Sequence, residues 1–155
     1  MTPSQNFAMI SRLWFLKVLN KTQNIVERDE NRYQEALKNI EIFNLENQIT
    51  PILKDAFEVE LTDEFDLIFI DAAKAQSIKF FEKFEGNLKK KGTVITDNLN
   101  FHGMVQKDEK EITSRNVRGI VRKTKAYIEF LKENKNYETT FYDIGDGISI
   151  SIKNT

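Results

Sequence analysis

The chain has 155 residues, of which 40% are hydrophobic and 30% charged, and its formal net charge is −1. These values predict one globular domain over residues 1–155 and exclude a general attraction to nucleic acid or acidic membranes. The lack of cysteine excludes disulfides, thiolate zinc sites and cysteine nucleophiles. Because the apolar stretch Phe7–Leu19 is shorter than the ~20 residues that span a bilayer, we expect a cytoplasmic protein with no membrane contact.

The first part of the chain is predicted to alternate helices and strands. Phe7–Leu19 is expected to be a helix and Asn24–Glu27 a short strand. Apolar residues recur at helical spacing over Asp29–Asn44, and Asp29 is placed to cap that helix. Gln48–Leu53 is expected to be the next strand.

The second part is predicted to contain two strands, two helices and a C-terminal hairpin. In chain order these are the strand Asp66–Asp71, the helix Gln76–Leu88, the strand Thr93–Asp97, the helix Ile112–Asn134, and the strands Tyr137–Ile144 and Ile148–Ile152. Lys89–Gly92 is expected to end the helix before it, since cations and glycine favour helix C-termini. A Gly-Asp-Gly turn joins the last two strands. The order of elements predicts a three-layer α/β sandwich, with helices on both faces of a mostly parallel sheet and an antiparallel end.

Two predicted strands end in polar residues that offer candidate chemistry. Asp71 ends one apolar strand, and Asp97-Asn98 ends the next. Carboxyl ends of parallel strands meet at one sheet edge, where open α/β sheets bind ligands. These three side chains would offer oxygen atoms to a cation such as Mg²⁺, and Lys74 would serve as a base or charge partner. A strand-end Asp can also cap the next helix, and phosphatases and nucleotide hydrolases share the pattern.

Acidic residues also follow the two earlier strands. Glu27 ends the first strand, where an acid binds both ribose hydroxyls in nucleotide-binding α/β folds. The alternative is a first-turn carboxylate that favours the helix dipole. Asp55-Ala56, just past the next strand, lies at the same edge and is placed to approach an adenine ring, with loop polarity as the equal alternative.

The helix Ile112–Asn134 separates a buried stripe from a cationic one. The expected buried stripe is Val117, Ile120, Val121, Thr124, Ile128 and Leu131, and the cationic ridge, at 3-4-3 spacing, is Arg115, Arg118, Arg122 and Lys125. Such a ridge is more commonly a solvent-exposed helix face. The more specific hypothesis is that it binds a row of RNA phosphates. His102, in the loop after Asp97-Asn98, has either a surface role or a contact with substrate.

Five segments carry a family resemblance. They are Ile25–Tyr33, Phe65–Lys74, Val94–Asn98, Phe101–Gly103 and Ile144–Ile148. Together they resemble the bacterial catechol-type O-methyltransferases, and within these the tRNA 5-hydroxyuridine methyltransferases of Gram-positive bacteria. The likeness runs from about residue 24 to the C-terminus, with the motifs in order at the expected spacing.

The resemblance implies a Rossmann-like methyltransferase sandwich, S-adenosylmethionine as methyl donor, and Mg²⁺ or another divalent cation. The matched residues are the metal ligands Asp71, Asp97 and Asn98, the catalytic pair Lys74 and Asp71, and the cofactor-binding residues Glu27, Asp55, Ala56 and Asp71. The implied acceptor is 5-hydroxyuridine in tRNA, with a small catechol-like hydroxyl compound as the alternative. We also expect a homodimer.

The front of the chain departs from this pattern. The family has a first strand followed by a glycine-rich turn that cradles the methionine half of the cofactor, whereas the first glycine here is Gly86. We therefore expect a sheet without the usual first strand. Either Phe7–Leu19 takes its place, or the chain is a truncated or frame-altered product. The alternative function is accordingly a non-catalytic methyltransferase remnant that binds metal, RNA or a partner protein.

Overall fold

A computed structural model describes residues 22–71 and 74–155, so the helix predicted at Phe7–Leu19 lies outside the described residues. The chain divides into two compact units, residues 1–60 and 61–155. Each is described by itself below. Within the described ranges, no helix is both long and apolar enough to cross a membrane.

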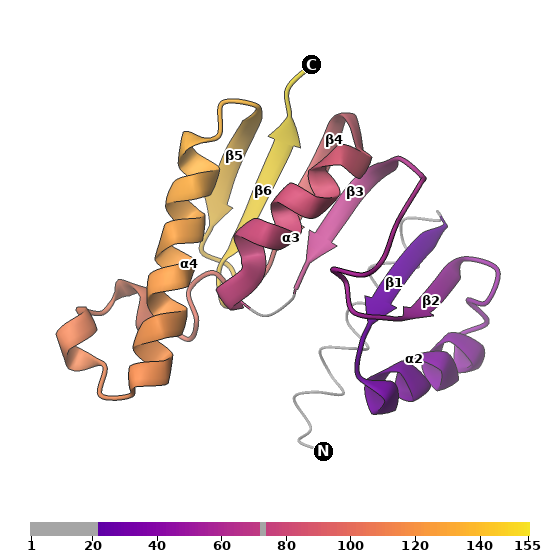
Figure 1. Ribbon diagram of the computed structural model, residues 1–155, viewed down its shortest axis with the longest axis horizontal. Coiled ribbons are helices and arrows are strands. Elements are labelled where there is room, and N and C mark those ends of the chain that lie inside the picture. The colour runs from indigo at the N-terminus through magenta and orange to yellow at the C-terminus, as the bar shows by residue number, and fades with distance from the viewer. Residues whose placement is uncertain (1–21, 72–73) are drawn as a thin grey trace. The chain divides into compact units, whose positions relative to one another are not determined.

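Over residues 22–60, the first unit contains a two-stranded parallel sheet and helix α2 (Figure 1). Strand β1 (Gln23–Glu27) pairs in register with β2 (Ile49–Leu53), and α2 (Glu30–Ile42) connects them. Asp29 caps α2, as predicted, because its side chain accepts a hydrogen bond from the Arg32 N–H at 3.0 Å. Buried Ile40, Leu45 and Ile49 form the core of this unit with Ile25 against them.

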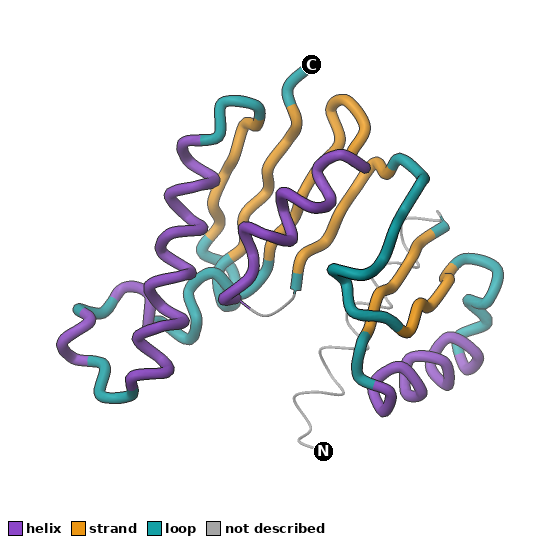
Figure 2. The backbone as a smooth tube through the Cα atoms, viewed as in Figure 1, coloured by secondary structure: helices purple, strands orange, loops and turns teal. Residues whose placement is uncertain are grey.

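The second unit contains a four-stranded mixed sheet in the order β3-β4-β6-β5 (Figures 1 and 2). The elements are β3 (Phe65–Ile70), η1 (Lys74–Gln76), α3 (Ser77–Phe84), η2 (Glu85–Asn87), β4 (Leu88–Thr96), η3 (Met104–Gln106), η4 (Glu109–Glu111), α4 (Arg115–Glu133), β5 (Tyr137–Tyr142) and β6 (Ile148–Lys153). Strands β3 and β4 are parallel, whereas β6 runs antiparallel to both β4 and β5. The predicted C-terminal hairpin is therefore confirmed.

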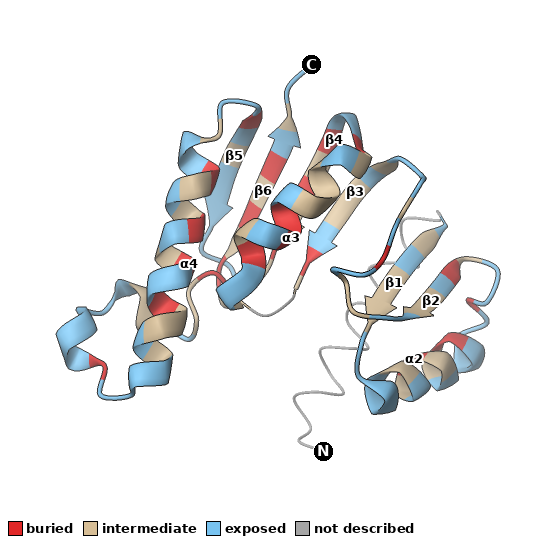
Figure 3. Ribbon diagram, in the orientation of Figure 1, coloured by how far each residue is buried: buried red, intermediate tan, exposed pale blue. Residues whose placement is uncertain are grey.

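Helices α3 and α4 cover the same face of this sheet, and both helices and the strands beneath them contain buried residues (Figure 3). Phe81 of α3 is 1% exposed and packs edge-on against Tyr137 of β5, with 4.9 Å between ring centroids. The Tyr127 hydroxyl of α4 hydrogen-bonds the Thr96 hydroxyl of β4 at 2.7 Å. Aromatic side chains thus pack between the helices and the sheet, and one of them bonds Thr96, the last residue of β4.

One predicted helix end is wrong. The sequence pattern places a helix C-terminus at Lys89–Gly92, but α3 ends at Phe84 and this segment belongs to β4. The pairing of β4 with β3 is irregular here, because Phe65 pairs with Leu88 whereas Leu67 pairs with Thr93. The lysines form the exposed, bulged part of a strand, with Lys91 at φ 59°. Cations and glycine suit a bulge as well as a helix end, so composition alone could not separate the two.

Burial of Tyr127 predicts a loss of stability at alkaline pH. Burial raises the pKa of Tyr127 to about 12, against the lowering effect of its hydrogen bond with Thr96. The unfolded chain ionises this phenol near pH 10, so the unfolding free energy should fall as pH rises from 10 to 12, by about 2–3 kcal/mol from this group. Tyr127→Phe should lose that part of the fall in urea titrations across this range. A variant whose alkaline profile matches the wild type would contradict the assignment.

Candidate functional site

The ends of β3 and β4 bring four predicted site residues together. The Asn98 Nδ2 donates to Asp71 Oδ1 at 3.1 Å, and the Lys74 Nζ lies 3.5 Å from the same oxygen. The Lys74 Nζ also donates to the Asp97 carbonyl at 2.8 Å. The side chains of Asp71 and Lys74 are only 11% and 14% exposed. The Asp71 carboxylate, the Asn98 amide and the Lys74 ammonium therefore lie together where the sequence predicted a site. Asp97 contacts this cluster through its backbone carbonyl, and its Oδ1 accepts from the Asn98 N–H at 2.6 Å.

The backbone explains why these residues meet. Asp71 directly follows β3, and the Asp97 N–H donates to the Ile70 carbonyl at 3.2 Å, so the parallel pairing extends to the last residue before the site. Asn98 then takes the left-handed conformation with φ 61°, which Asn tolerates better than most residues. This turn allows its amide to reach Asp71. Lys74 opens η1, and the buried Ser77 hydroxyl donates to the Lys74 carbonyl at 3.2 Å.

The donor atoms in this cluster suit a hard cation. Two carboxylates and one ammonium give these side chains a formal charge of −1, and carboxylate and amide oxygens are ligands that Mg²⁺ accepts. Rotation of the Asn98 amide would exchange Nδ2 for Oδ1 toward the same point. The described residues hold no group of three or more His, Cys, Asp or Glu side chains with metal-site geometry. Any metal here would therefore depend on the Asn98 amide as well as the carboxylates.

The predicted nucleoside-binding residues lie together within the first unit. The Glu27 Oε1 accepts from the N–H groups of Arg28 at 2.8 Å and Asp29 at 2.9 Å. Asp55 follows β2 and contacts Arg28, with 3.3 Å between Asp55 Oδ2 and the guanidinium. The hydrogen bond from the Phe57 N–H, followed by that from Arg28, holds the pKa of Asp55 below its ordinary value against partial desolvation. Ala56 is half-buried beside it. The two acids thus share the carboxyl edge of this parallel pair, as predicted.

The cationic ridge lies on α4, largely in solvent. Arg115, Arg118 and Arg122 are exposed, whereas Lys125 is half-buried and its Nζ donates to the Lys107 carbonyl at 3.3 Å. The buried stripe is as expected at Val121, Thr124 and Leu131, and the other three members of the predicted stripe are half-buried. Tyr127, absent from the predicted stripe, is buried as well. Three arginines therefore remain on one accessible face.

The loop after Asn98 is held by the turn between β5 and β6, a connection that the sequence did not predict. The Leu99 N–H donates to the Gly147 carbonyl at 2.9 Å, and the Asn100 N–H to the Asp146 carbonyl at 2.7 Å. The His102 side chain is 82% exposed, while its backbone N–H donates to Asp146 Oδ1. The only signal in the sequence is the Gly-Asp-Gly turn itself, and a turn motif does not indicate a contact so far along the chain.

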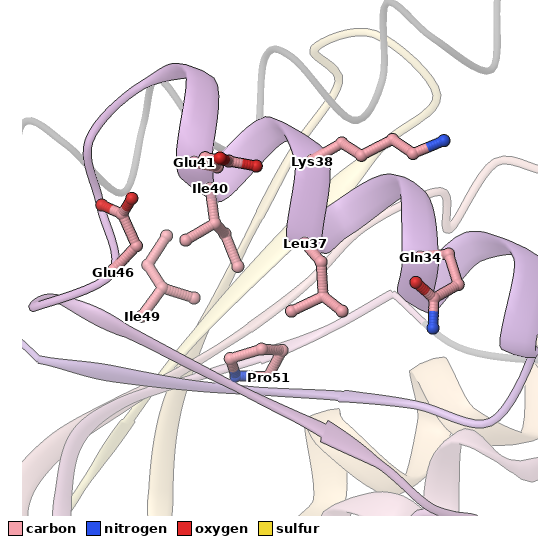
Figure 4. Close-up of a pocket in the computed structure, with 8 residues that line it drawn as sticks. All are labelled: Gln34, Leu37, Lys38, Ile40, Glu41, Glu46, Ile49 and Pro51. Atoms are coloured by element: carbon pink, nitrogen blue, oxygen red, sulfur yellow. The ribbon is translucent and has the colours of Figure 1, made fainter.

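A groove of about 530 Å³ lies elsewhere, between α2 and β2 of the first unit (Figure 4). Apolar Leu37, Ile40, Ile49 and Pro51 line it, with Lys38 and Glu41 also on its wall. It contains none of the predicted site residues. The chemistry expected from the sequence therefore lies outside this groove.

Comparisons with known proteins identify a sequence family and a fold for this chain. A sequence family described as O-methyltransferase matches residues 13–154. A candidate caffeoyl-CoA O-methyltransferase from Staphylococcus aureus superposes with a TM-score of 0.79 at 44% identity, over 85% of this chain and 64% of that one. The O-methyltransferase of Bacillus cereus in complex with SAH superposes with a TM-score of 0.72 at 22% identity, over 85% of this chain and 62% of that one.

A curated plant relative, the caffeoyl-CoA O-methyltransferase of Populus kitakamiensis, is 24% identical over 132 residues, which are 81% of this chain and 56% of the relative. The chain thus spans somewhat more than half the length of this relative and under two thirds of the two solved structures. The superpositions confirm the predicted Rossmann-like α/β fold.

Proposed function

Since the chain belongs to the O-methyltransferase family, whose pattern covers residues 13–154, we propose that it transfers a methyl group from S-adenosylmethionine to a hydroxyl, with a divalent cation, and that the acceptor is 5-hydroxyuridine in tRNA. The observation that carries this proposal is the cluster at the ends of β3 and β4. There Asn98 Nδ2 and Lys74 Nζ lie 3.1 and 3.5 Å from one oxygen of Asp71. Activation of a hydroxyl needs oxygen ligands for a cation and a group that takes or shields the hydroxyl proton, and a lysine beside such ligands could supply both.

Each residue of the cluster has a distinct role in this proposal. Asp71, Asp97 and Asn98 would hold the cation. When bound, the cation would lower the pKa of the acceptor hydroxyl and fix its orientation. Lys74 would take or shield the hydroxyl proton at Nζ. Low exposure of Asp71 and Lys74 excludes water and strengthens their electrostatic effect on the reacting oxygen.

The nucleoside half of the cofactor would be bound by residues of the first unit. Two backbone N–H groups hold the Glu27 carboxylate through Oε1. Its other oxygen would accept hydrogen bonds from the ribose hydroxyls. Asp55 and Ala56 would border the adenine. Orientation of Glu27 by the backbone keeps its carboxylate in place before the ligand arrives, which lowers the entropy lost on binding.

Metal removal tests the proposal directly. Methyl transfer to tRNA should require added Mg²⁺ and stop with a chelator, and Asp97→Ala should abolish Mg²⁺ binding by calorimetry because it removes one of two carboxylates. Asp66→Ala, which removes an exposed carboxylate of β3 that contacts Lys89, is the matched control. Methyl transfer that persists in chelator would contradict metal dependence.

Binding of S-adenosylmethionine separates the enzyme from the alternative. Residues 1–85 contain no glycine, and close approach of a backbone to a ligand usually needs glycine. Cofactor binding is therefore the property that tests the alternative of a remnant without catalysis. An active chain should bind the cofactor in an equilibrium titration, and Glu27→Ala should weaken that binding. A chain that binds Mg²⁺ or RNA but not the cofactor would establish the remnant instead.

The cationic ridge supplies a test of the tRNA acceptor. The three accessible arginines of the ridge, on a slightly acidic protein, would form a local track for phosphates. Arg118→Ala/Arg122→Ala should weaken tRNA binding and lower the slope of log K against log salt by about 1.5–2 units, while Mg²⁺ affinity stays unchanged.

A charge-matched control for the ridge is Lys123→Ala/Lys132→Ala. It removes two exposed cations of α4 that lie outside the ridge. An equal loss of slope in both variants would assign the effect to net charge, and an unchanged slope in the ridge variant would make a small catechol-like compound the better acceptor.

A further inference from the structure

We propose that Asp146, in the turn between β5 and β6, is a positioning residue for Asn98. Its carboxylate fixes loop 98–103, and the loop holds the Asn98 amide against Asp71. The effect on methyl transfer rests on the proposed function, whereas the effect on the Asn98 amide does not.

Asn98 is fixed by backbone contacts on both sides. Before it, the Asp97 N–H donates to the Ile70 carbonyl at 3.2 Å. After it, the Leu99 N–H donates to Gly147 of the turn at 2.9 Å, and Leu99 is only 3% exposed. Asn98 itself has a left-handed backbone, with φ 61°. Because the backbone is held on both sides of Asn98, the position of the turn contributes to where the Asn98 side chain points.

The end of the loop is strained, and Asp146 contacts it at the strained residue. Phe101 and His102 both have left-handed backbones, with φ 46° and 55°, a conformation that is strained in residues other than glycine. Asp146 Oδ1 accepts from the His102 N–H at 2.5 Å, and Oδ2 lies 3.7 Å from His102 Nδ1. The Asp146 side chain is 17% exposed. A charged acceptor bound to a backbone N–H is worth more than a neutral one, so it offsets the strain.

The turn and the loop are in close contact at Gly147. Gly147 has φ 82°, and a Cβ there would lie 2.9 Å from Asn100 Cγ and 3.0 Å from Asn100 N. The Asn100 side chain also donates to Asp143 Oδ1 at 2.8 Å. These contacts therefore fix the position of the loop relative to the turn. Loss of the Asp146 carboxylate would release the strained residues 101–102, and the Asn98 amide would leave Asp71 more often.

Hydrogen exchange at two N–H groups tests this chain of contacts. In Asp146→Ala, exchange of the His102 backbone N–H and of the Asn98 side-chain amide should each accelerate about tenfold, the effect of losing one charged hydrogen bond. Asp146→Asn should restore both rates, because its amide oxygen still accepts from His102. Glu138→Ala, an exposed carboxylate on β5 of the same hairpin, should change neither.

The outcomes are separable. Acceleration at His102 with an unchanged Asn98 amide would overturn the proposal and leave Asp146 a structural residue only. If Asp146→Ala does not fold, Asp146→Glu, which moves the carboxylate, decides by the same two rates. In an active protein, Asp146→Ala should lower kcat about tenfold by the same reasoning without changing affinity for S-adenosylmethionine. A wild-type chain that transfers no methyl group refutes the proposed function, and the exchange rates still decide the role of Asp146.

Discussion

Lys74→Met is expected to lower kcat for methyl transfer by about 10²–10⁴-fold, the usual contribution of a positioned acid or base. The Lys74 Nζ lies 3.5 Å from Asp71 Oδ1 and 2.8 Å from the Asp97 carbonyl, at the centre of the cluster. A methionine of similar length preserves packing but removes the amino group, and with it both of the roles proposed for Lys74, proton acceptor or positive charge. Single-turnover kinetics with saturating cofactor would measure the chemical step directly.

Two further variants separate the possible roles of this lysine. Lys74→Arg keeps the charge but cannot act as a base. Activity retained in Lys74→Arg would assign electrostatic shielding, and activity lost in it would assign proton transfer. Lys79→Met, an exposed lysine of α3, is the matched control and should be neutral. If Lys74→Met were as active as the control, Lys74 would have no catalytic role.

Phe81→Ala is expected to destabilise the second unit by about 3–5 kcal/mol, the range for a buried aromatic truncated to alanine. Phe81 is 1% exposed and its ring contacts Tyr127, Phe130 and Tyr137, at centroid distances of 6.5, 5.4 and 4.9 Å. Its removal would open a cavity between both helices and the sheet. Urea unfolding followed by circular dichroism measures the loss.

The neighbouring Phe84 provides the control for Phe81. It lies on the same helix, is half-buried, and has the Lys83 ammonium 5.6 Å from its ring centre. Phe84→Ala should cost clearly less, because part of the ring already faces water. Equal losses in the two variants would show that α3 responds to helix propensity rather than to the ring cluster.

The sequence predicted the positions of the strand-end residues better than it predicted the contacts that hold them. Strand-end acids can be recognised because an apolar run that stops at Asp71 or Asp97 is typical of a buried strand reaching the sheet edge, and the structure brings both segments to one edge. The bulge at Lys89–Gly92 was missed, since cations and glycine serve bulges and helix ends alike. The anchor at Asp146 was missed because no local pattern marks a contact between a turn and a loop 44 residues away.

The contact between loop 98–103 and the last turn also sets an order of events during synthesis. Chains emerge from the ribosome N-terminus first, at about 5–20 residues per second. Strands β3 and β4 can pair early, but the N–H groups of Leu99, Asn100 and His102 find their acceptors only on Asp146 and Gly147. The acids at the strand ends therefore emerge well before the arrangement around Asn98 can form. A nascent chain that has not reached β6 would contain the residues of the candidate site but not the hydrogen bonds that arrange the loop around Asn98.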